Sequence, residues 1–560
     1  MSEPVHAMPA PAPIPAPLDF PIEWPAPEMA MAFWVQDRMH MPNPSSPMSS
    51  WLAEQFAAGF TSGLGSYGVP LGVQTTRLNT YFYMAIGPTV PPEMMPELME
   101  KAAPNLMAGV GNFWQRWESE WLPELKRGWA EFSALDYPKL SDQELLAFVA
   151  RARNLYERAW HIHFELLVPA MLGTSTFQDV YAGLFPDKSE LDAYRLLQGF
   201  DSMSLEAGRK LWELSRVAKA DATVRAILDS TSARDVPAAL ERSAEGRAFL
   251  TRVNEYTAFY GRRSETVQEL DSPSWTEDPS PVIDNIKAYI GQGDDPAVAH
   301  QKLATERERH VAAARAAIAN QPAEVRGQFE GLLAAGQSFT RVMEDHNFWI
   351  DQRSLHEVRH LCLDIGRRLQ ERGQIRAAAD VFMFRMEEAT SLLTSPSTDG
   401  KTTVGERRAE MAWWAKISAP PVAGTDYGPP PPEDPIAKAI GRFFGAPPTA
   451  APTRTEVTGN AGSPGKVTGI ARVILTIADA GRLGEGEILV TPTTAPPWTP
   501  FFATAAAVVT ETGGVLSHCA IVAREYGIPA VVGAAGVTAI VKDGARIEVD
   551  GDKGVVRMLS

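Results

Sequence analysis

The hydrophobic pattern of the chain changes at about residue 455, and this change constrains the fold more than any other feature. Before it, apolar residues recur at helical spacing over long stretches, and after it short β-branched runs alternate with glycine. Periods of 3.6 and 2 residues are typical of helices and strands respectively. The sequence therefore predicts a multidomain protein, with a mainly α-helical domain followed by a small α/β domain. The 560 residues suffice for two to four domains.

Helical periodicity is clearest behind a capping box. Ser141 is followed by Glu144, a pair that caps the first turn of a helix, and apolar residues then recur at helical spacing as far as Trp160. The stretch 31–120, rich in aromatic residues and methionine, is expected to form irregular structure over an apolar surface. Further helices are expected over residues 190–217, 295–320, 322–350, 352–372 and 376–394.

Proline-rich segments mark the boundaries between domains. Residues 1 to about 28 alternate proline with alanine, and two further proline-rich runs flank the short helical pattern PIAKAIGRFFG. The last segment contains the strand patterns KVTGIARVIL, EILVTP, AAVVTE, IPAVVG and ARIEVD, with a helix at about 516–526. We predict a Pro/Ala-rich tail over 1–30, a helical domain over 31–423, a hinge over 424–454 and an α/β domain over 455–560.

Composition excludes several classes of function. The chain has 68 acidic and 52 basic residues, a net charge of −16, which opposes a groove that neutralises phosphates. Nucleic acid is therefore not an expected partner. No run reaches the ~18 apolar residues of a membrane span, and the N-terminus lacks the pattern of a signal peptide. Two cysteines, Cys362 and Cys519, are too few for a disulfide framework, so we expect a cytoplasmic protein with no membrane partner.

The segment that most indicates chemistry is TGGVLSHCAIVAREYG, residues 512–527. A strand pattern runs into two glycines that allow a tight turn, and Ser517 and His518 then begin a helix. The free N–H groups of a helix N-terminus favour an anion, so an imidazole there can carry phosphate. Attack by a neutral ring nitrogen gives a phosphoramidate, whose charge Ser517, Arg524 and the helix N-terminus would stabilise. The competing interpretation is a capping serine with an incidental histidine.

The whole segment 459–559 resembles the swivelling phosphohistidine domain of the phosphoenolpyruvate-utilising enzymes. The resemblance rests on EILVTP, on TETGGVLSHCAIVAREYGIPAVVG and on the closing DG and VDG turns. In that family the histidine accepts phosphate from an ATP-grasp domain and swings to a second site to deliver it. The resemblance implies that His518 is the phosphocarrier. The residues expected to stabilise the phosphate are Thr512, Gly513, Gly514, Ser517 and Arg524.

The helical region, over most of 31–415, resembles the substrate-binding domain of the rifampin phosphotransferase and phenylphosphate synthase families. Among the matching fragments are FYGRRSETVQELDSPSW (259–275) and MEDHNFWIDQRSLHEVRHL (343–361). The second usually opens with Arg-Glu, where this chain has Met343-Glu344, so Glu344 and His346 are the better candidates for polarising an acceptor hydroxyl. Solvated or salt-bridged helical faces are the competing interpretation. The full set of acceptor-site candidates is Arg262, Arg263, Glu265, Glu344 and His346.

No nucleotide-binding motif is apparent. GNAGSPGKVTG departs from a P-loop, because Asn460 stands at the position of the first glycine and Val467 replaces the Ser or Thr that would contact magnesium. No ATP-grasp domain is recognisable, and the chain ends without room for the pyruvate-binding barrel of phosphoenolpyruvate synthase. We expect ATP and Mg²⁺ to be bound by a separate ATP-grasp subunit. This chain itself is expected to bind no metal and no cofactor tightly.

The predicted function is that of a phosphocarrier and acceptor-binding subunit of a dikinase-type kinase. The family resemblance implies that acceptor, ATP and water give phosphorylated acceptor, AMP and phosphate. Thirteen of the fourteen tryptophans precede residue 450, which favours a small phenolic acceptor. The alternatives are a component of a rifamycin-type antibiotic phosphotransferase and a phosphorelay protein without a small-molecule substrate. A more remote alternative is a zinc metalloprotease, because residues 356–360 read HEVRH, an HExxH pattern.

Overall fold

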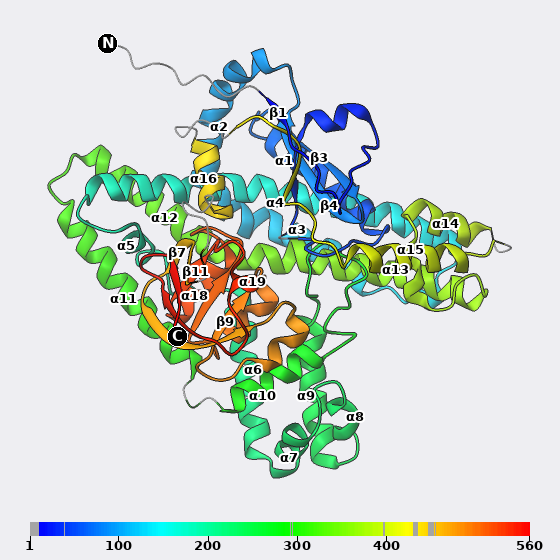
Figure 1. Ribbon diagram of the computed structural model, residues 1–560. Coiled ribbons are helices and arrows are strands. Elements are labelled where there is room, and N and C mark those ends of the chain that lie inside the picture. The colour runs from blue at the N-terminus through cyan, green and yellow to red at the C-terminus, as the bar shows by residue number, and fades with distance from the viewer. Residues whose placement is uncertain are drawn as a thin grey trace.

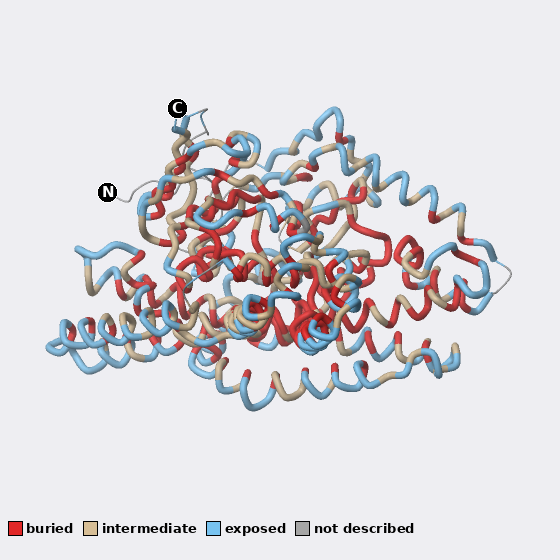
Figure 2. Tube along the Cα trace, turned by 90° about the horizontal axis from the view of Figure 1, so that it is seen from below, coloured by how far each residue is buried: buried red, intermediate tan, exposed pale blue. Residues whose placement is uncertain are grey.

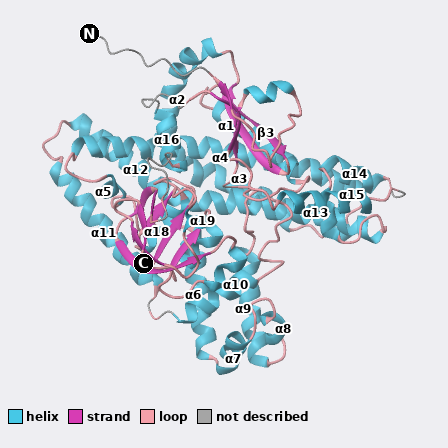
Figure 3. Ribbon diagram, viewed as in Figure 1, coloured by secondary structure: helices cyan, strands magenta, loops and turns pink. Residues whose placement is uncertain are grey.

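In the computed structural model, helices make up most of the chain, and a C-terminal α/β region packs against them (Figures 1 and 3). This agrees with the predicted multidomain, helix-rich chain with a C-terminal α/β region. Within the described part of the chain, no helix is both long and apolar enough to cross a bilayer. The structure describes residues 11–38, 40–291, 293, 295–395, 398–428, 435–445, 453 and 455–559.

The longest helix, α4 (Asp142–Leu184), is the axis of the helical region. The predicted capping box is present at its start: the Ser141 hydroxyl accepts from the N–H of Glu144, and the Glu144 carboxylate accepts from the N–H of Ser141. Three other long helices pack against α4, namely α1 (Ser49–Gly65), α2 (Met95–Arg116) and α12 (Ala323–His346).

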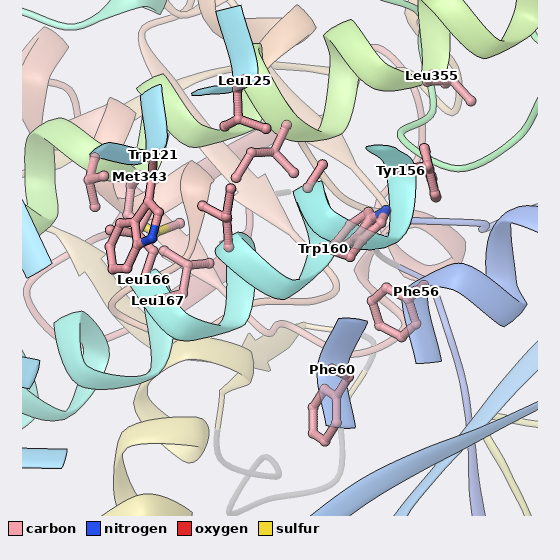
Figure 4. Packing of buried hydrophobic residues seen from close by; sticks show 14 of the residues in the cluster. Phe56, Phe60, Trp121, Leu125, Tyr156, Trp160, Leu166, Leu167, Met343 and Leu355 are labelled. Atoms are coloured by element: carbon pink, nitrogen blue, oxygen red, sulfur yellow. The ribbon is translucent and has the colours of Figure 1, made fainter. Parts of the chain in front are cut away.

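The core of the helical region forms where α1 crosses α4. Gly59 allows this approach, since a Cβ there would lie 2.5 Å from the Cβ of Trp160. Phe56 packs edge-on against the Trp160 ring, with ring centres 4.8 Å apart, and Tyr156 and Leu166 extend the cluster along α4 (Figure 4). Figure 2 shows buried segments gathered toward the middle of the molecule and exposed ones along the outer helices.

The remaining helices confirm most of the periodic stretches. The predicted helices over 295–320 and 352–372 are α11 and α13, but the one over 190–217 is interrupted between α5 and α6, where Gly199 has a φ of 73°. The stretch 322–350 is α12 followed by a π-helical segment, η5 (Asn347–Gln352). The other helices are α3 (Leu122–Ser133), α5 (Glu190–Tyr194), α6 (Met203–Ala220), α7 (Ala222–Ser230), α8 (Val236–Leu240), α9 (Ala244–Tyr260), α10 (Ser280–Gly291), α11 (Pro296–Ala317), α13 (Arg353–Glu371), α14 (Met386–Thr394) and α15 (Lys401–Trp414).

A five-stranded antiparallel sheet in the N-terminal region is the main departure from the predicted fold. The expectation of irregular structure over 31–120 is wrong, because this stretch contains α1, α2 and three strands. Two of them form a hairpin around Asn79 and Thr80, whose φ angles are 47° and 72°. This turn lacks the glycine by which such hairpins are recognised in a sequence. The sheet order is β1 (Ala12–Pro13), β5 (Val422–Asp426), β2 (Phe33–Gln36), β4 (Tyr81–Pro88) and β3 (Leu71–Leu78).

Part of the predicted tail packs on this sheet. Residues 1–10 lie outside the described residues, but Ala12 and Pro13 pair with β5. Phe20 is fully buried, with its ring centre 5.4 Å from that of Trp414. Apolar side chains between the prolines thus attach this segment to the sheet, although its Pro/Ala alternation predicts a segment that buries little.

The C-terminal region holds an eight-stranded sheet in which β8 to β11 run parallel. The five predicted strands are present as β8 to β12, and the predicted helix is α18 (His518–Tyr526), which follows β10. Two short helices, α17 (Thr499–Phe502) and α19 (Val537–Ile540), accompany it. The sheet order is β6 (Glu456–Thr458), β13 (Val555–Met558), β12 (Arg546–Asp550), β8 (Lys466–Val473), β9 (Ile488–Thr491), β10 (Ala507–Thr510), β11 (Ala530–Val532) and β7 (Asn460–Ser463).

The predicted hinge contains the short helix that the sequence indicates, α16 (Pro435–Phe444). This helix is docked on α4, because the Arg442 guanidinium donates to Ser175 at 2.7 Å and to Asp179 at 2.9 Å. The hinge residues 429–434, 446–452 and 454 lie outside the described residues. The described part of the hinge thus begins with the end of β5, in the five-stranded sheet, and continues with a helix held against the helical region.

Candidate active site

A large cavity lies where the C-terminal region meets the helical region. Apolar side chains of α1, α4, α16 and the β3–β4 hairpin form most of its wall, and the segment that begins α18 forms a polar part. The cavity holds about 1630 Å³ of empty space, its mouth included. Six of the residues proposed from sequence line it: Glu344, His346, Thr512, Gly513, Ser517 and His518.

His518, at the start of α18, is hydrogen-bonded through both ring nitrogens. Its Nδ1 lies 3.0 Å from Oγ1 of Thr494, and its Nε2 lies 3.1 Å from Oγ1 of Thr499. Burial lowers the pKa of His518 to about 3, so the ring is neutral at physiological pH. A neutral imidazole has one nitrogen with a free lone pair, and a hydroxyl can donate or accept. The ring is thus held in place and remains able to attack phosphorus.

The segment before His518 builds a place for an anion. Gly513 has a φ of 105°, and a Cβ there would lie 2.8 Å from Oγ of Ser517. That hydroxyl is buried and makes no hydrogen bond, so it can donate to a phosphoryl oxygen beside the free N–H groups of the first turn of α18. The N–H of Gly514 is not free, because it donates to the carbonyl of Phe443 in α16 at 2.8 Å.

Glu344, near the end of α12, faces His518 from the helical region. Its Oε1 lies 3.8 Å from Nε2 of His518 and makes no hydrogen bond, while its Oε2 accepts from the Ser204 hydroxyl. Burial raises the pKa of Glu344 to about 7. A carboxyl group at this place can take a proton from a hydroxyl that approaches the imidazole.

Three further side chains line the cavity and form what we term the His-His-Asp cluster: His163, His346 and Asp351. Oδ1 of Asp351 lies 3.1 Å from Nδ1 of His163, and its Oδ2 lies 3.8 Å from Nε2 of His346. Oδ2 also accepts from the side-chain amide of Asn347 at 2.8 Å. Nδ1 of His346 lies 2.8 Å from the carbonyl of Val342. All three side chains of the cluster are buried.

Arg524 does not line the cavity around His518. Its guanidinium donates to the carbonyls of Gly462 and Val515, each at 2.8 Å, and lies 4.0 Å from the centre of the Tyr194 ring. These contacts join α18 to its own sheet and to the helical region. The structure thus gives Arg524 a packing role and does not place it beside the proposed phosphate.

Arg262, Arg263 and Glu265 also lie outside the cavity. Arg262 donates to Glu357 at 2.8 Å, and the Arg263 guanidinium is buried over two aromatic rings. Glu265 accepts from the N–H of Ile477, in the C-terminal region, at 2.8 Å. These three charged side chains make contacts within the fold, as the competing interpretation predicts. Of the acceptor-site candidates, only Glu344 and His346 line the cavity that contains His518.

The HExxH pattern does not form a site with a free base. His356 and His360 lie one turn apart with ring centres 4.4 Å from each other, but Glu357 is paired with Arg262 at 2.8 Å and with Arg353 at 2.7 Å. Burial beside these cations lowers the pKa of His356 to about 2. Among the described residues, the group with metal-ligand spacing is the His-His-Asp cluster.

The sequence analysis does not identify Thr494, Thr499, His163 or Asp351 as site residues. The two threonines follow β9, and side chains at the carboxyl ends of parallel strands commonly gather at a site, which is a usable signal. Asp351 offers no such signal. It meets His163 from 188 residues away along the chain, and only the packing of α12 on α4 brings the two together.

Two family models match the chain. Residues 483–554 match the mobile domain of the PEP-utilising enzymes, where PEP is phosphoenolpyruvate, and residues 163–344 match the fourth domain of rifampicin phosphotransferase. The first match contains His518, and the second begins at His163 and ends at Glu344. The two matches therefore include His518 and Glu344, which face each other in the cavity.

Curated relatives agree with these matches. Chondramide synthase cmdD of Chondromyces crocatus is 36% identical over 95% of this chain and 14% of that protein. The uncharacterized phosphotransferase YvkC of Bacillus subtilis is 31% identical over 73% of this chain and 48% of that protein. The rifampicin phosphotransferase of Streptomyces sviceus is 27% identical over 78% of this chain and 49% of that protein.

The chain thus spans about half or less of the length of these relatives. Its relatives include proteins named as phosphotransferases, and the matched segments are a mobile domain and a rifampicin phosphotransferase domain. These findings confirm the resemblance to the PEP-utilising, dikinase-type phosphotransferases that the sequence implies.

Proposed function

We propose that the chain carries phosphate on His518 and transfers it, inside the cavity, to a hydroxyl group of a small aromatic acceptor. The observation that carries this proposal is the 3.8 Å approach of a neutral imidazole to the unpaired Oε1 of Glu344. These are the groups that would deliver phosphate and take up the hydroxyl proton. The resemblance to phosphotransferases supports the same reaction class.

The transfer step can be written with the groups that are present. The bond between phosphorus and the ring nitrogen of His518 breaks, the ring keeps the electron pair, and a bond forms between phosphorus and the acceptor oxygen. The hydroxyl proton passes to the Glu344 carboxylate. The Ser517 hydroxyl and the N–H groups at the start of α18 would bind the phosphoryl oxygens, where charge develops.

We propose ATP as the source of the phosphate, bound with Mg²⁺ by an ATP-grasp partner of this chain. His518 is buried against the helical region, so it would have to leave the cavity to meet a nucleotide. The hinge that the sequence predicts over 424–454 is the proposed place of this movement. The overall products would be the phosphorylated acceptor, AMP and phosphate.

The acceptor is proposed to be a phenol. Part of the cavity wall is formed by aromatic rings, those of Phe56, Phe60, Phe164 and Phe443. The polar groups lie together at one place, around His518 and Glu344. An aromatic body would lie against the phenylalanines with its hydroxyl toward these groups. A bulkier hydroxyl compound is the second candidate, because relatives are named for chondramide and rifampicin.

An acceptor panel tests this proposal. Phenols, aliphatic alcohols, sugars and rifamycins would be incubated with the chain, an ATP-grasp partner and Mg-ATP, and AMP release and phosphorylated product would be measured. We expect a phenol to turn over with wild-type chain and not with His518→Gln. Turnover by rifamycins alone would select the bulkier acceptor. Turnover by sugars or aliphatic alcohols alone would refute the aromatic assignment, and equal turnover by His518→Gln would refute the carrier.

A further inference from the structure

We propose that the His-His-Asp cluster is a binding site for a divalent transition-metal ion of the Zn²⁺ class. The sequence predicts no metal for this chain. The cluster combines α4, the end of α12 and η5, and the ligand atoms of His163, His346 and Asp351 all lie within 4.8 Å of one another. Zn²⁺ bonds of about 2.0–2.2 Å to nitrogen and oxygen place such atoms roughly 3–4 Å apart. Only a small closure would bring these three around one ion.

The contact between His346 and Asp351 shows why a cation fits. The Val342 carbonyl, 2.8 Å from Nδ1 of His346, can only accept, so Nδ1 carries the proton and Nε2 of the neutral ring carries a lone pair. Nε2 faces Oδ2 of Asp351 at 3.8 Å. Two acceptor atoms therefore face each other in a buried place, which is unfavourable unless a positive centre lies between them.

The groups around the cluster are those that support metal ligands. Metal-bound histidines commonly donate their other ring N–H to a carbonyl, as Nδ1 of His346 does to Val342. The carboxylate of Asp351 is held by the amide of Asn347 at 2.8 Å, and ligating carboxylates are themselves usually hydrogen-bonded. The ligands and their supporting contacts thus come from adjoining turns of one continuous helical stretch, with His163 added from α4.

The ligand set selects the class of metal. Two imidazoles and one carboxylate suit Zn²⁺, Co²⁺ and related ions better than Mg²⁺ or Ca²⁺, which prefer oxygen ligands. Three protein ligands leave a further position open toward the cavity that these residues line. If the proposed phosphotransfer holds, the open position would bind the acceptor hydroxyl. Metal binding itself does not depend on that function.

Cobalt binding tests the site with the full-length chain and Co²⁺ alone as the probe. The metal-stripped protein would be titrated with Co²⁺ and followed by visible absorption and by equilibrium dialysis. We expect one Co²⁺ per chain, displaced by Zn²⁺, with a spectrum free of thiolate bands. A strong thiolate band would assign the metal to Cys519 and would overturn the proposal. The absence of Co²⁺ binding would also overturn it, and a water molecule would then be the expected occupant between Nε2 of His346 and Oδ2 of Asp351.

Variants locate the ion. His163→Ala and Asp351→Asn should lose Co²⁺ binding, and Asn347→Ala should weaken it roughly 10- to 100-fold. His161→Ala is the matched control on the same helix, since His161 bonds Ser62 and Glu165, and it should bind normally. Loss of binding in His360→Ala with retention in His163→Ala would place the metal at the HExxH pattern instead. The melting temperature of each metal-free variant shows whether it is folded. Co²⁺ binding by the folded Asp351→Asn chain would also overturn the proposal.

Discussion

The two polar walls of the cavity differ in the kind of group they present. The wall from the C-terminal region holds one imidazole among hydroxyl groups, with Thr494 and Thr499 on the ring and Ser517 beside it. The wall from the helical region holds ionisable groups, Glu344 and the His-His-Asp cluster. Hydroxyls position a neutral ring and a phosphate without competing for the proton, whereas carboxylates can receive it. In the proposed mechanism, phosphate would therefore bind at the wall from the C-terminal region, and the acceptor's proton would pass to the wall from the helical region.

The largest expected effect on activity comes from a substitution in the wall from the C-terminal region, where phosphate is proposed to bind. His518→Gln keeps a side chain that can bond the two threonines, but an amide nitrogen cannot carry phosphate, so transfer to any acceptor should fall by about 10³-fold or more. Phosphate incorporation into the chain would be measured with labelled ATP and the partner. Labelling of the variant at the wild-type level would place the carrier elsewhere, and an unchanged melting temperature would show that the fold is kept.

A substitution in the wall from the helical region should affect only the second step, the transfer of phosphate from His518 to the acceptor. Glu344→Gln keeps the bond with Ser204 and removes the proton acceptor, so transfer from the phosphorylated chain should slow roughly 10²- to 10⁴-fold. Labelling of His518 should continue. Asp345→Asn is the matched control, because Asp345 accepts from the N–H of Met203 at 2.9 Å and does not line the cavity. Equal loss in both variants, or loss of labelling in Glu344→Gln, would contradict the division between the walls.

A smaller effect is expected from the hydroxyls on the ring. A hydrogen bond of this type contributes about 0.5–1.5 kcal/mol, so Thr499→Val should slow labelling of His518 roughly threefold to tenfold. Thr493→Val is the control, because Thr493 lies between β9 and α17 and lines the cavity, and this variant should label normally. Pre-steady-state labelling would measure both rates. An unchanged rate in Thr499→Val would show that the hydroxyl does not orient the ring.

The sequence predicts the cavity wall from the C-terminal region far better than the wall from the helical region. His518, Gly513 and Ser517 belong to one continuous motif whose turn, helix start and anion site follow from local chemistry. Glu344 is indicated by resemblance, but its distance to His518 depends on the docking of two regions. Asp351 is not indicated at all, because a site assembled from separate helices leaves no local pattern. For the same reason the sequence does not distinguish Arg262 and Arg263, which lie within a matching fragment, from site residues, because their contacts with Glu357 and with aromatic rings depend on the fold.

The smallest effect concerns one of the contacts between the two regions. Glu525 in α18 accepts from the N–H of Gly199 with both oxygens, each at 2.9 Å, and burial raises its pKa to about 8. Between the ordinary pKa of 4.5 and 8 the folded chain therefore binds more protons than the unfolded chain, and stability falls as pH rises through this window. In Glu525→Gln the melting temperature should therefore fall by a few degrees less than in the wild-type chain as pH rises through this window. A decline equally steep in the variant would assign it to another group.

The most direct test of the central claim, that phosphate passes from His518 to an acceptor in this cavity, is a single-turnover chase. The chain would be labelled on His518, freed of nucleotide and partner, and mixed with the phenol that turns over best. We predict that label leaves the wild-type protein and appears on the phenol in equal amount, and that Glu344→Gln retains the label much longer. Label that stays on wild-type protein until the ATP-grasp partner is restored, or that passes to water alone, would contradict the account.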